Sequence, residues 1–564
     1  MSKVNLIIDG IEVVADSSDT ILEAAKKAGI EIPTLCYLKD VCQDGACRVC
    51  VVEVKGKANL VTSCNNKVAE GMIVETNNNR VMKARKTNIE LVLSNHNKKC
   101  LTCGKNLKCK LQKLSYEFGC DETKTGGEVE SKLDLSSPCI VRDNSKCVLC
   151  GRCVNMCKNI QATSAIAKQY RGYSTIVGCQ FDKPVEESTC VGCGQCVLVC
   201  PTGALLETSN ISKVTNFMND PENIVIAQVA PAVRVALGEE FGYQMGDFVE
   251  GKMVTALKRC GFNKVFDVNV GADLTVLEES AELIDRLTKG EKLPLFTSCC
   301  PAWKKYLSIH YPEYVSHLSS CKSPNEMLGA VIKNYYAKVN DIDPAKIKVV
   351  AVMPCTAKKH EIVGNEDVDA VLTTRELAAL IKMKNINFNM LPDSAFDNPL
   401  GNYSGAALIF GVTGGVTEAA LRTVADKLTD GKGAVDFKTV RQSNGLKEIK
   451  LTVSDKNLSI CVVNGLKNAE TVLEQIVKGK KHYDFVEVMA CPGGCVNDGG
   501  QPFVDYTKTD YYDVAKLRAR GLYKHDQKLE SRKSHQNTQV MDLYENFLVP
   551  NGLHKKLLHH HHEE

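Results

Sequence analysis

Two cysteine-rich stretches decide the fold of the central part of the chain: CVLCGRCVNMC (residues 147–157) and CVGCGQCVLVCP (residues 190–201). Each contains a C-x2-C-x2-C-x3-C run. Two such runs are typical of a pair of [4Fe–4S] clusters, in which the fourth thiolate of each run binds the other cluster. One cluster is therefore expected on Cys147, Cys150, Cys153 and Cys200, and the other on Cys190, Cys193, Cys196 and Cys157.

The segment around these runs, residues 137–209, resembles bacterial two-cluster ferredoxins. Its second run ends with Pro201, as is usual, whereas the first has Lys158 where proline is usual. Zinc is a poor alternative here, because two runs with crossed ligation match a pair of cubane clusters.

The composition of the whole chain limits the classes of protein to which it can belong. At 564 residues it should form several domains, and its net charge of +3 without a long basic run gives no sign of nucleic-acid binding. No signal-peptide core opens the sequence and no run of about 20 apolar residues predicts a membrane span. A large chain with 27 cysteines and no export signal indicates metal binding in a reducing compartment, so a cytoplasmic location is expected. The tail, residues 551–564, is left out of the predicted fold because HKKLLHHHHEE resembles a purification tag or a basic tail.

Residues 1–80 are predicted to form a small sheet-and-helix domain. The run VNLIIDGIEVVA has a hairpin signal at Asp9-Gly10, and the following SSDTILEAAKKAG predicts a capped helix that ends at Gly29. Five cysteines follow, at positions 36, 42, 47, 50 and 64. A β-grasp domain with four loop thiolates is similar to plant-type ferredoxins, which hold [2Fe–2S]. Spacing alone leaves open whether Cys36 or Cys42 is a ligand, and zinc is the alternative metal.

Residues 81–125 contain the stretch SNHNKKCLTCGKNLKC (94–109). A Cys3His zinc site would explain this pattern by itself. Its position between two other iron–sulfur segments favours a [4Fe–4S] cluster with one imidazole ligand. The expected ligands are His96, Cys100, Cys103 and Cys109.

From residue 210 to residue 550 the pattern becomes α/β. Four apolar runs predict buried strands, and each ends in an unusual motif. Because ligands of parallel sheets lie beyond the carboxyl ends of the strands, we expect one pocket at the rim of one sheet. The runs are residues 223–230, 292–298, 346–353 and 483–490, and the cysteines brought to the pocket are Cys299, Cys300, Cys355, Cys491 and Cys495.

Cys299 and Cys300 are adjacent in the stretch PLFTSCCPAWKKY (294–306). Neighbouring side chains on extended backbone point to opposite sides, so the two thiols can do different work. The alternatives are a chance pair of buried thiols or a vicinal disulfide.

Three of the strand-end motifs carry a family resemblance. FTSCCPAW (296–303), MPCTAKKHE (353–361) and EVMACPGGCVNDGGQP (487–502) look like the signature motifs of [FeFe]-hydrogenases. The whole chain apart from the tail resembles the monomeric clostridial type, which has four accessory clusters. The resemblance implies a multidomain α+β fold with a two-lobed α/β catalytic domain. It also favours Cys36 over Cys42 as the [2Fe–2S] ligand.

The resemblance further implies an H-cluster, a [4Fe–4S] cubane joined to a diiron unit with CO, cyanide and azadithiolate. Motif by motif, the cubane ligands would be Cys300, Cys355, Cys491 and Cys495, with the Cys495 sulfur also bridging to the diiron unit. Cys299 would pass protons as a general acid and base, and Lys358 would hold a cyanide by a charge-assisted hydrogen bond. The matching pocket positions are Ala230, Pro231, Ser323, Met353, Phe410 and Met489.

A proton route is expected to reach Cys299. Glu279, Glu282 and Arg286 lie at i, i+3 and i+7 of a predicted helix, which by periodicity alone is more typical of a solvated, salt-bridged face. The resemblance reverses that preference and adds Ser319 to the route. The opposite stripe of the helix is expected to be buried: Leu274, Leu277, Ala281 and Ile284.

Four residues depart from the family pattern. Asp498 stands where three successive glycines are usual, and Cys321 stands where alanine is expected. Asn325 replaces a common glutamine and Ala232 a common serine. None of these changes removes an expected cluster ligand.

The resemblance implies catalysis of 2H⁺ + 2e⁻ ⇌ H₂ with electrons from ferredoxin or flavodoxin, and a diiron unit installed by hydrogenase maturation proteins. A non-catalytic iron–sulfur protein acting in cluster assembly or H₂ sensing is the alternative. A nicotinamide-linked subunit is a third possibility, although no Rossmann G-x-G-x-x-G follows a strand here, so partner subunits would be needed.

Overall fold

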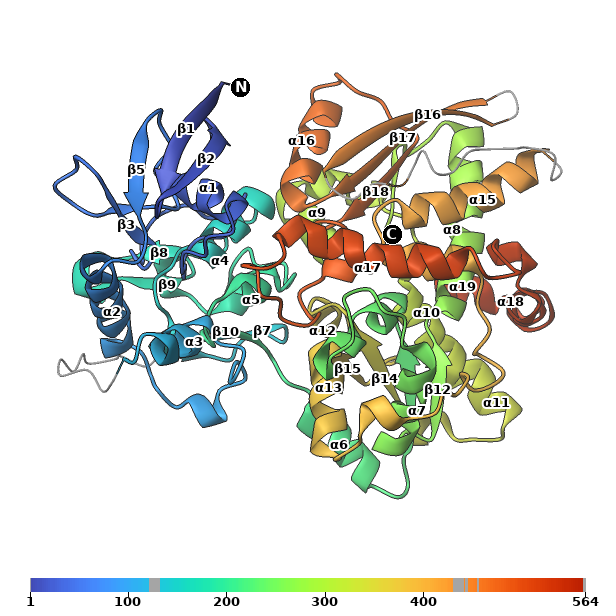
Figure 1. The fold of residues 1–564 in the computed structure, drawn as a ribbon. Helices are drawn as coiled ribbons and strands as arrows, with labels where there is room; N and C mark the ends of the chain where they lie inside the picture. The colour runs from blue at the N-terminus through green and yellow to red at the C-terminus, as the bar shows by residue number, and fades with distance from the viewer. Residues whose placement is uncertain (1, 121–131, 430–440, 442–444, 454–455, 561–564) are drawn as a thin grey trace. The chain divides into compact units, whose positions relative to one another are not determined.

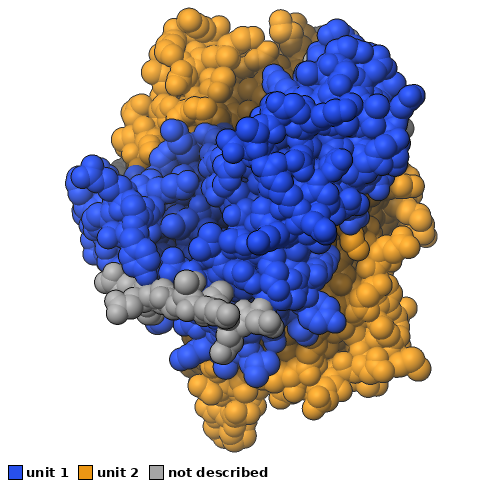
Figure 2. All heavy atoms as spheres, turned by 60° about the vertical axis from the view of Figure 1, so that its left-hand side comes forward, with its two compact units in different colours: residues 1–159, 164–190, 199–206 blue, residues 160–163, 191–198, 207–564 orange. Residues whose placement is uncertain are grey.

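The computed structural model describes residues 2–120, 132–429, 441, 445–453 and 456–560. The chain divides into two compact units (Figure 2). Unit 1 comprises residues 1–159, 164–190 and 199–206, and unit 2 comprises residues 160–163, 191–198 and 207–564.

Unit 1 begins with a five-stranded sheet of order β2-β1-β5-β3-β4. The expected hairpin joins β1 and β2, and both of its turn residues have positive φ, 49° at Asp9 and 83° at Gly10. Thr20 and Glu23 form a reciprocal capping box at the start of α1, as the sequence predicts. The helix packs on a core of alternating strand residues such as Leu6 and Ile8. The elements are β1 (Lys3–Ile8), β2 (Ile11–Asp16), α1 (Ile21–Lys27), β3 (Val51–Val54), β4 (Val61–Thr62) and β5 (Met72–Glu75).

The rest of unit 1 is built from short elements that surround cysteine-bearing loops. A small sheet has the order β10-β7-β6, and β8 pairs with β9 as an antiparallel ribbon. Two helices, α2 and α3, enclose a separate apolar core. The elements are α2 (Asn79–Ser94), α3 (Lys110–Glu117), β6 (Leu133–Asp134), β7 (Ile140–Asp143), α4 (Arg152–Asn155), β8 (Ala167–Gln169), β9 (Ile176–Gly178) and β10 (Leu205–Glu207).

Unit 2 contains two four-stranded sheets (Figure 1). The first has the order β12-β11-β14-β15, and all of its strand pairs are parallel. Its strands are buried on both faces, which explains their nearly continuous apolar sequences. The strands are β11 (Ile224–Val229), β12 (Lys264–Asp267), β14 (Ile347–Met353) and β15 (Ala370–Thr373).

The second sheet of unit 2 has the order β13-β18-β17-β16. Its first three strands are parallel and its edge strand β16 is antiparallel to β17. The strands are β13 (Leu295–Phe296), β16 (Leu446–Val453), β17 (Lys456–Asn464) and β18 (Phe485–Met489). The four predicted strands therefore form, but β11 and β14 belong to one sheet and β13 and β18 to the other. The expectation of a pocket at the rim of a single sheet is wrong in this respect.

Helices cover both sheets of unit 2. The long helix α8 contacts both cores, because Leu274 packs in the core of the first sheet and Leu283 in that of the second. The helices of unit 2 are α6 (Ile211–Asn219), α7 (Glu250–Cys260), α8 (Asn269–Lys289), α9 (Pro301–His310), α10 (Pro324–Val331), α11 (Ala337–Val339), α12 (Lys358–Glu361), α13 (Thr374–Met383), α14 (Gly405–Leu408), α15 (Gly415–Thr429), α16 (Leu466–Val477), α17 (Tyr511–Asp526), α18 (Thr538–Leu543) and α19 (Leu553–Leu558). The short helix α5 (Gln195–Val199) lies at the boundary of the two units.

Within the described ranges, none of the helices combines the length and the apolar character that a membrane crossing requires.

Candidate active site

The loop after β13 places the adjacent cysteines in different surroundings. Cys299 packs against an apolar cluster that contains Phe410 and Met489. Cys300 packs against a different cluster, with Trp303 and Cys355. Cys300 has extended backbone, with φ −98° and ψ 106°, and α9 begins at the next residue, Pro301. Both cysteines are free thiols, so the vicinal disulfide is excluded, and the expected opposite orientation explains the two environments.

Cys300 and three further thiols of unit 2 lie near one another at the strand ends. Burial is the first cause that raises the pKa of Cys355 well above its usual value, and the Cys300 and Cys495 thiolates add to it. Burial is also the first cause that raises the pKa of Cys491 well above its usual value, and the Cys355 and Cys300 thiolates contribute to the rise. The four expected cubane ligands are thus brought into one group, in which Cys355 and Cys491 are buried and Cys300 and Cys495 partly buried. They come from loops that follow three different strands.

Asp498, the departure from a glycine run, lies among these thiols. Its carboxylate accepts hydrogen bonds from Cys491 Sγ at 3.4 Å and from the Gly499 amide at 2.6 Å. The side chain is 3% exposed, and burial raises its pKa to about 6. The departure therefore introduces a carboxylate beside the expected cubane ligands.

Cys300, Cys355, Cys491 and Cys495 form a donor set that fits an iron–sulfur centre. The loop that carries Cys491 and Cys495 also needs glycine. Gly494 has φ +92°, and a Cβ there would lie 2.7 Å from the Thr413 amide nitrogen. Soft, buried thiols on such a close-fitting loop are the donor set of iron–sulfur clusters.

The expected pocket residues are all buried. Met353 and Met489 end β14 and β18, and Ala230 follows β11. Even the bulky Phe410 is only 7% exposed. Ser323 is also the N-cap of α10, where its hydroxyl accepts from the α10 backbone at 3.4 Å. The buried positions are Ala230, Pro231, Ser323, Met353, Phe410 and Met489.

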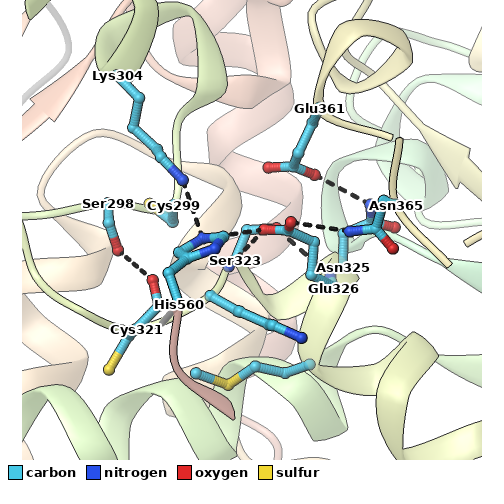
Figure 3. A network of polar contacts seen from close by, with 12 residues as sticks. Ser298, Cys299, Lys304, Cys321, Ser323, Asn325, Glu326, Glu361, Asn365 and His560 are labelled. Carbon is cyan, nitrogen blue, oxygen red and sulfur yellow. Dashed lines mark hydrogen bonds and ion pairs between the residues drawn. The ribbon is translucent and has the colours of Figure 1, made fainter. Parts of the chain in front are cut away.

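Lys358 lies beside Cys299. Figure 3 shows Glu361 and Asn325, two members of the polar network around it. Its ammonium donates to both carboxylate oxygens of Glu361, at 2.7 and 2.9 Å, and to the Cys299 carbonyl at 3.3 Å. Burial alone would lower the pKa of Lys358, but the Glu361 charge raises it above the usual value. Asn325 donates to Glu361 at 3.0 Å, so this departure supports the carboxylate that orients Lys358.

The residues of the expected proton route are connected. Ser319 Oγ donates to Glu282 at 2.8 Å, and Arg286 donates to the other oxygen of Glu282 at 2.5 Å. Glu279 is 2% exposed, and burial together with the Glu282 charge raises its pKa to about 8. The Glu279 charge in turn raises the pKa of Cys299, after burial. The structure therefore brings Cys299, Glu279, Ser319, Glu282 and Arg286 together in this order.

The expected pattern of α8 is only partly right. Leu274 and Leu277 are buried, but Ala281 is exposed and Ile284 is partly exposed, while Leu283 is buried instead. The first twelve residues of α8 are buried all around because the helix passes between the two cores. A solvated, salt-bridged face is thus excluded for Glu279.

The sequence patterns did not indicate several polar residues that lie beside the site. Glu361 lies three residues after Lys358 on α12, a spacing that could have revealed the ion pair. Glu326 completes the S-x-x-E capping box that starts at Ser323. His559 and His560 were missed because the tail carries no motif. Cys321, noted as a departure, is fully buried, and its carbonyl accepts from Ser298 at 2.7 Å.

In unit 1, four thiols of the N-terminal domain meet in two hydrogen-bonded pairs. The Cys36 thiol bonds to Cys47 and lowers the pKa of Cys47 to about 6, and Cys64 bonds to Cys50. Cys36 and Cys64 also interact through charge. Cys42 faces elsewhere, toward the Cys150 carbonyl at 3.6 Å. This arrangement fits a [2Fe–2S] ligand set of Cys36, Cys47, Cys50 and Cys64, with Cys36 rather than Cys42 as the first ligand.

The His96 segment fits a metal ligand set as well. His96 Nδ1 is buried without a hydrogen-bond partner, and burial lowers the pKa of the imidazole to about 4. A neutral imidazole with an unsatisfied nitrogen is suited to coordinate iron. Cys103 and Cys109 interact through charge, and Cys100 begins a 3₁₀ helix that ends just before Cys103.

The two cysteine runs of residues 147–200 supply one ligand set within unit 1. A cavity there is lined by Cys147, Cys150, Cys153 and Cys200. This is the crossed combination, three thiols from the first run and the last from the second. The other expected set is divided between the units: Cys157 and Cys190 belong to unit 1, and Cys193 and Cys196 to unit 2. That set stays a prediction.

Family models match nearly all of these regions. The C-terminal domain of the iron-only hydrogenase large subunit matches residues 223–500, and the iron hydrogenase small subunit matches residues 512–564. In the N-terminal part, a 2Fe-2S cluster-binding domain matches residues 1–79 and a 4Fe-4S dicluster domain residues 146–204. Between them, residues 85–124 match the iron–sulfur binding region of NADH-ubiquinone oxidoreductase G.

Relatives match over almost the full length. The chain is 45% identical to NADP-reducing hydrogenase subunit HndD of Solidesulfovibrio fructosivorans, over 97% of this chain and 96% of that protein. It is 40% identical to Iron hydrogenase 1 of Clostridium pasteurianum, over 97% of each. A structure of [FeFe]-hydrogenase HydA1 from Chlamydomonas reinhardtii has a TM-score of 0.55 at 36% identity, and covers 63% of this chain and 99% of that one.

Matches of this extent, together with the buried thiols at the strand ends, establish a hydrogenase with accessory iron–sulfur clusters. The chain belongs to the [FeFe]-hydrogenase family.

Proposed function

We propose that this chain catalyses the reversible reduction of protons to H₂ with electrons from reduced ferredoxin or flavodoxin. The observation that carries the proposal is the group of five thiols in unit 2, two of them buried and three partly buried. Cys299 interacts through charge with Glu279, and Ser319 donates a hydrogen bond to Glu282 beyond it. Such a set suits a protein that moves protons to an interior centre.

The active-site group would be the H-cluster, held by Cys300, Cys355, Cys491 and Cys495. When bound, it supplies an iron with an open position at which protons are reduced. One [2Fe–2S] cluster on Cys36, Cys47, Cys50 and Cys64 and three [4Fe–4S] clusters would carry the electrons. Maturation proteins would install the diiron unit.

The protein residues around the group then have separate roles. The Cys299 thiol is a general acid and base, and Glu279 supplies and removes its proton. Glu279 suits this role because its raised pKa, about 8, lets it hold or release a proton near neutral pH. Lys358, a buried cation, would stabilise an anionic ligand of the group, and the apolar side chains of Met353, Phe410 and Met489 would exclude water.

A small acidic electron carrier fits a surface of unit 1. Leu101, Leu107 and Tyr116 expose between 89% and 92% of their surface around the His96 segment. Contiguous patches of exposed apolar side chains mark interaction sites, and we propose that these three belong to one. Lysines are exposed in the same segment, and Glu117 is the first acidic residue after His96. The exposed lysines are Lys98, Lys99, Lys108 and Lys113.

A second candidate is supported by the similarity to a subunit named NADP-reducing. In that case the electrons would reach the chain from a nicotinamide through other subunits. The 27 free thiols suit a reducing compartment in either case, and we propose the cytoplasm.

One experiment separates the electron donors. The matured protein is given reduced ferredoxin, reduced flavodoxin or NADPH, and H₂ is measured. We expect H₂ with the first two and none with NADPH alone; H₂ from NADPH alone would contradict the proposal.

A matched pair of variants tests the surface. Lys98→Glu should raise the KM for ferredoxin and leave the rate with reduced methyl viologen unchanged, whereas Lys57→Glu, at another exposed lysine in the N-terminal domain, should change neither. Equal effects of the two variants would remove the surface from the proposal.

A further inference from the structure

The C-terminal segment of the described chain packs against the proton route. Leu557 and Leu558 of α19 are buried in the core of the first sheet. The Leu558 carbonyl then accepts from the Lys322 amide at 2.8 Å, and the His560 amide donates to the Ser320 carbonyl at 2.9 Å. This antiparallel pairing places His559 directly beside residues 320–321.

The His559 imidazole bridges two polar side chains. Its Nδ1 lies 2.9 Å from Ser320 Oγ, and its Nε2 lies 3.1 Å from Glu278 Oε2. The side chain is 18% exposed, so one edge reaches solvent. Glu278 is held in turn by the Tyr544 hydroxyl at 2.6 Å.

Ser320 connects this imidazole to the proton route. Its hydroxyl donates to Glu282 Oε2 at 3.2 Å, the same oxygen that accepts from Ser319 at 2.8 Å. Hydrogen bonds therefore run without a break from His559 through Ser320 to Glu282 and Ser319.

Arg286 is a poor candidate for the outer end of the route. It contacts Glu282, but a guanidinium does not release its proton in a protein. Its terminal nitrogens also donate to the carbonyls of Lys292, His317 and Leu318, at 2.8 to 3.0 Å. Arg286 is therefore suited to orient Glu282, whereas an imidazole can exchange a proton with water.

We propose that His559 relays protons between solvent and Glu282 through the Ser320 hydroxyl. This inference rests on the proton route of the proposed function. Inward, imidazolium Nδ1 gives its proton to Ser320 Oγ while the Ser320 proton passes to Glu282 Oε2. The neutral imidazole regains a proton from water, and Glu278 stabilises its charged form. The described ionisable groups around it are Glu278, Glu282, Cys321, Tyr544 and His554.

His560 offers a matched control on the same strand. Its Nε2 lies 3.0 Å from Lys304 Nζ and 3.7 Å from Glu326, in the network of Figure 3. Its ring thus reaches toward α9 and α10 rather than toward Ser320 Oγ and Glu282. His560 therefore lies on the same segment as His559, but its ring contacts Lys304 and Glu326 instead of Ser320 Oγ.

The test uses matured protein and reduced methyl viologen, which needs no protein partner. His559→Ala should lower H₂ production by roughly threefold to tenfold, less than the roughly hundredfold or more typical of a group at the reacting atom. Added imidazole should restore the rate of His559→Ala but not that of His559→Gln, which keeps hydrogen bonds but cannot titrate. His560→Ala should show no imidazole effect.

A second readout does not depend on the active-site group. In protein without the diiron unit, the carboxyl infrared bands that change with pH should shift in both His559 variants and not in His560→Ala. Unchanged H₂ production in both His559 variants, or equal imidazole rescue of His560→Ala, would overturn the proposal. Glu279→Gln, run in parallel, separates the two failures: if it abolishes turnover while the His559 variants do not, only the relay is wrong. If Glu279→Gln is also unchanged, the route itself fails.

Discussion

Glu279 shows how a single residue acquires a role from its surroundings. On a helix wheel it belongs to a polar stripe, yet in the fold it is 2% exposed and lies between Cys299 and Ser319. A carboxyl group in such a place keeps its proton to about pH 8 because burial disfavours the charge.

Glu279→Gln should nearly abolish H₂ production, because the amide fills the same space but cannot carry a proton. A loss of at least roughly 100-fold is expected for a group in direct proton transfer. The rate with reduced methyl viologen and the infrared spectrum of the active-site group would both be measured. Intact spectra with lost turnover support the role, and unchanged turnover removes Glu279 from the route.

The same substitution should change how stability depends on pH. The unfolded chain ionises Glu279 near pH 4.5, but the folded chain does so only near pH 8. The free energy of unfolding therefore falls as the pH rises between these values, and glutamine removes that loss. Relative to the parent, Glu279→Gln should gain on the order of 2–4 kcal/mol between about pH 5 and pH 8.

Chemical unfolding of the variant and the parent at both pH values tests this stability difference. Glu291→Gln, an exposed control just after α8, should show no such gain. A gain of the same size in the control, or none in Glu279→Gln, would contradict the raised pKa.

The choice between Cys36 and Cys42 could not be made from spacing at the residue scale. Both positions suit a loop before Cys47, and the difference arises only in three dimensions. Cys36 bonds to Cys47, whereas Cys42 turns toward Cys150, more than a hundred residues away. Such contacts between distant segments leave no signal in local spacing.

At the scale of elements, the strands β11, β13, β14 and β18 of unit 2 could be predicted because each is a short apolar run that ends in a motif. The strands β12, β15, β16 and β17 were not predicted. The pairing of the predicted strands into sheets could not be predicted either. β13 is only two residues long and pairs with β18, which is far away in sequence. Local patterns identify a strand, but the order within a sheet depends on packing between segments that are distant in sequence. For α8, the predicted polar stripe was misleading because the helix is enclosed on all sides in its first half.

The loop between β18 and α17 allows a test at this scale. Gly494→Ala should reduce the iron bound at the active site and lower stability, because its Cβ would meet backbone at Thr413 and the Met489 sulfur at 2.9 Å. Gly479→Ala is the control, since Gly479 also has positive φ, +63°, but nothing lies within 4 Å of its Cβ.

Backbone strain alone costs about 1–2 kcal/mol, so the control should lose no more than that and keep its full iron content. Iron analysis and thermal unfolding of both variants decide the matter. If the two variants behave alike, the close fit of the loop around the thiols is not needed.

At the scale of the whole molecule, the order of the cluster segments was predictable because cysteine spacing is a local pattern with a specific chemical meaning. The C-terminal segment was not, since HKKLLHHHHEE carries no motif and its role depends on pairing with residues 320–322. The family model of the iron hydrogenase small subunit includes this segment in its match, residues 512–564.

We propose above all that Cys300, Cys355, Cys491 and Cys495 hold an active-site group with CO and cyanide ligands. The most direct test is the infrared spectrum of the full chain produced with the maturation proteins. We predict bands of metal-bound CO and cyanide in the parent and their loss in Cys495→Ser, with the accessory clusters retained. A correctly matured parent without these bands, or a Cys495→Ser variant that keeps them unchanged, would contradict the account.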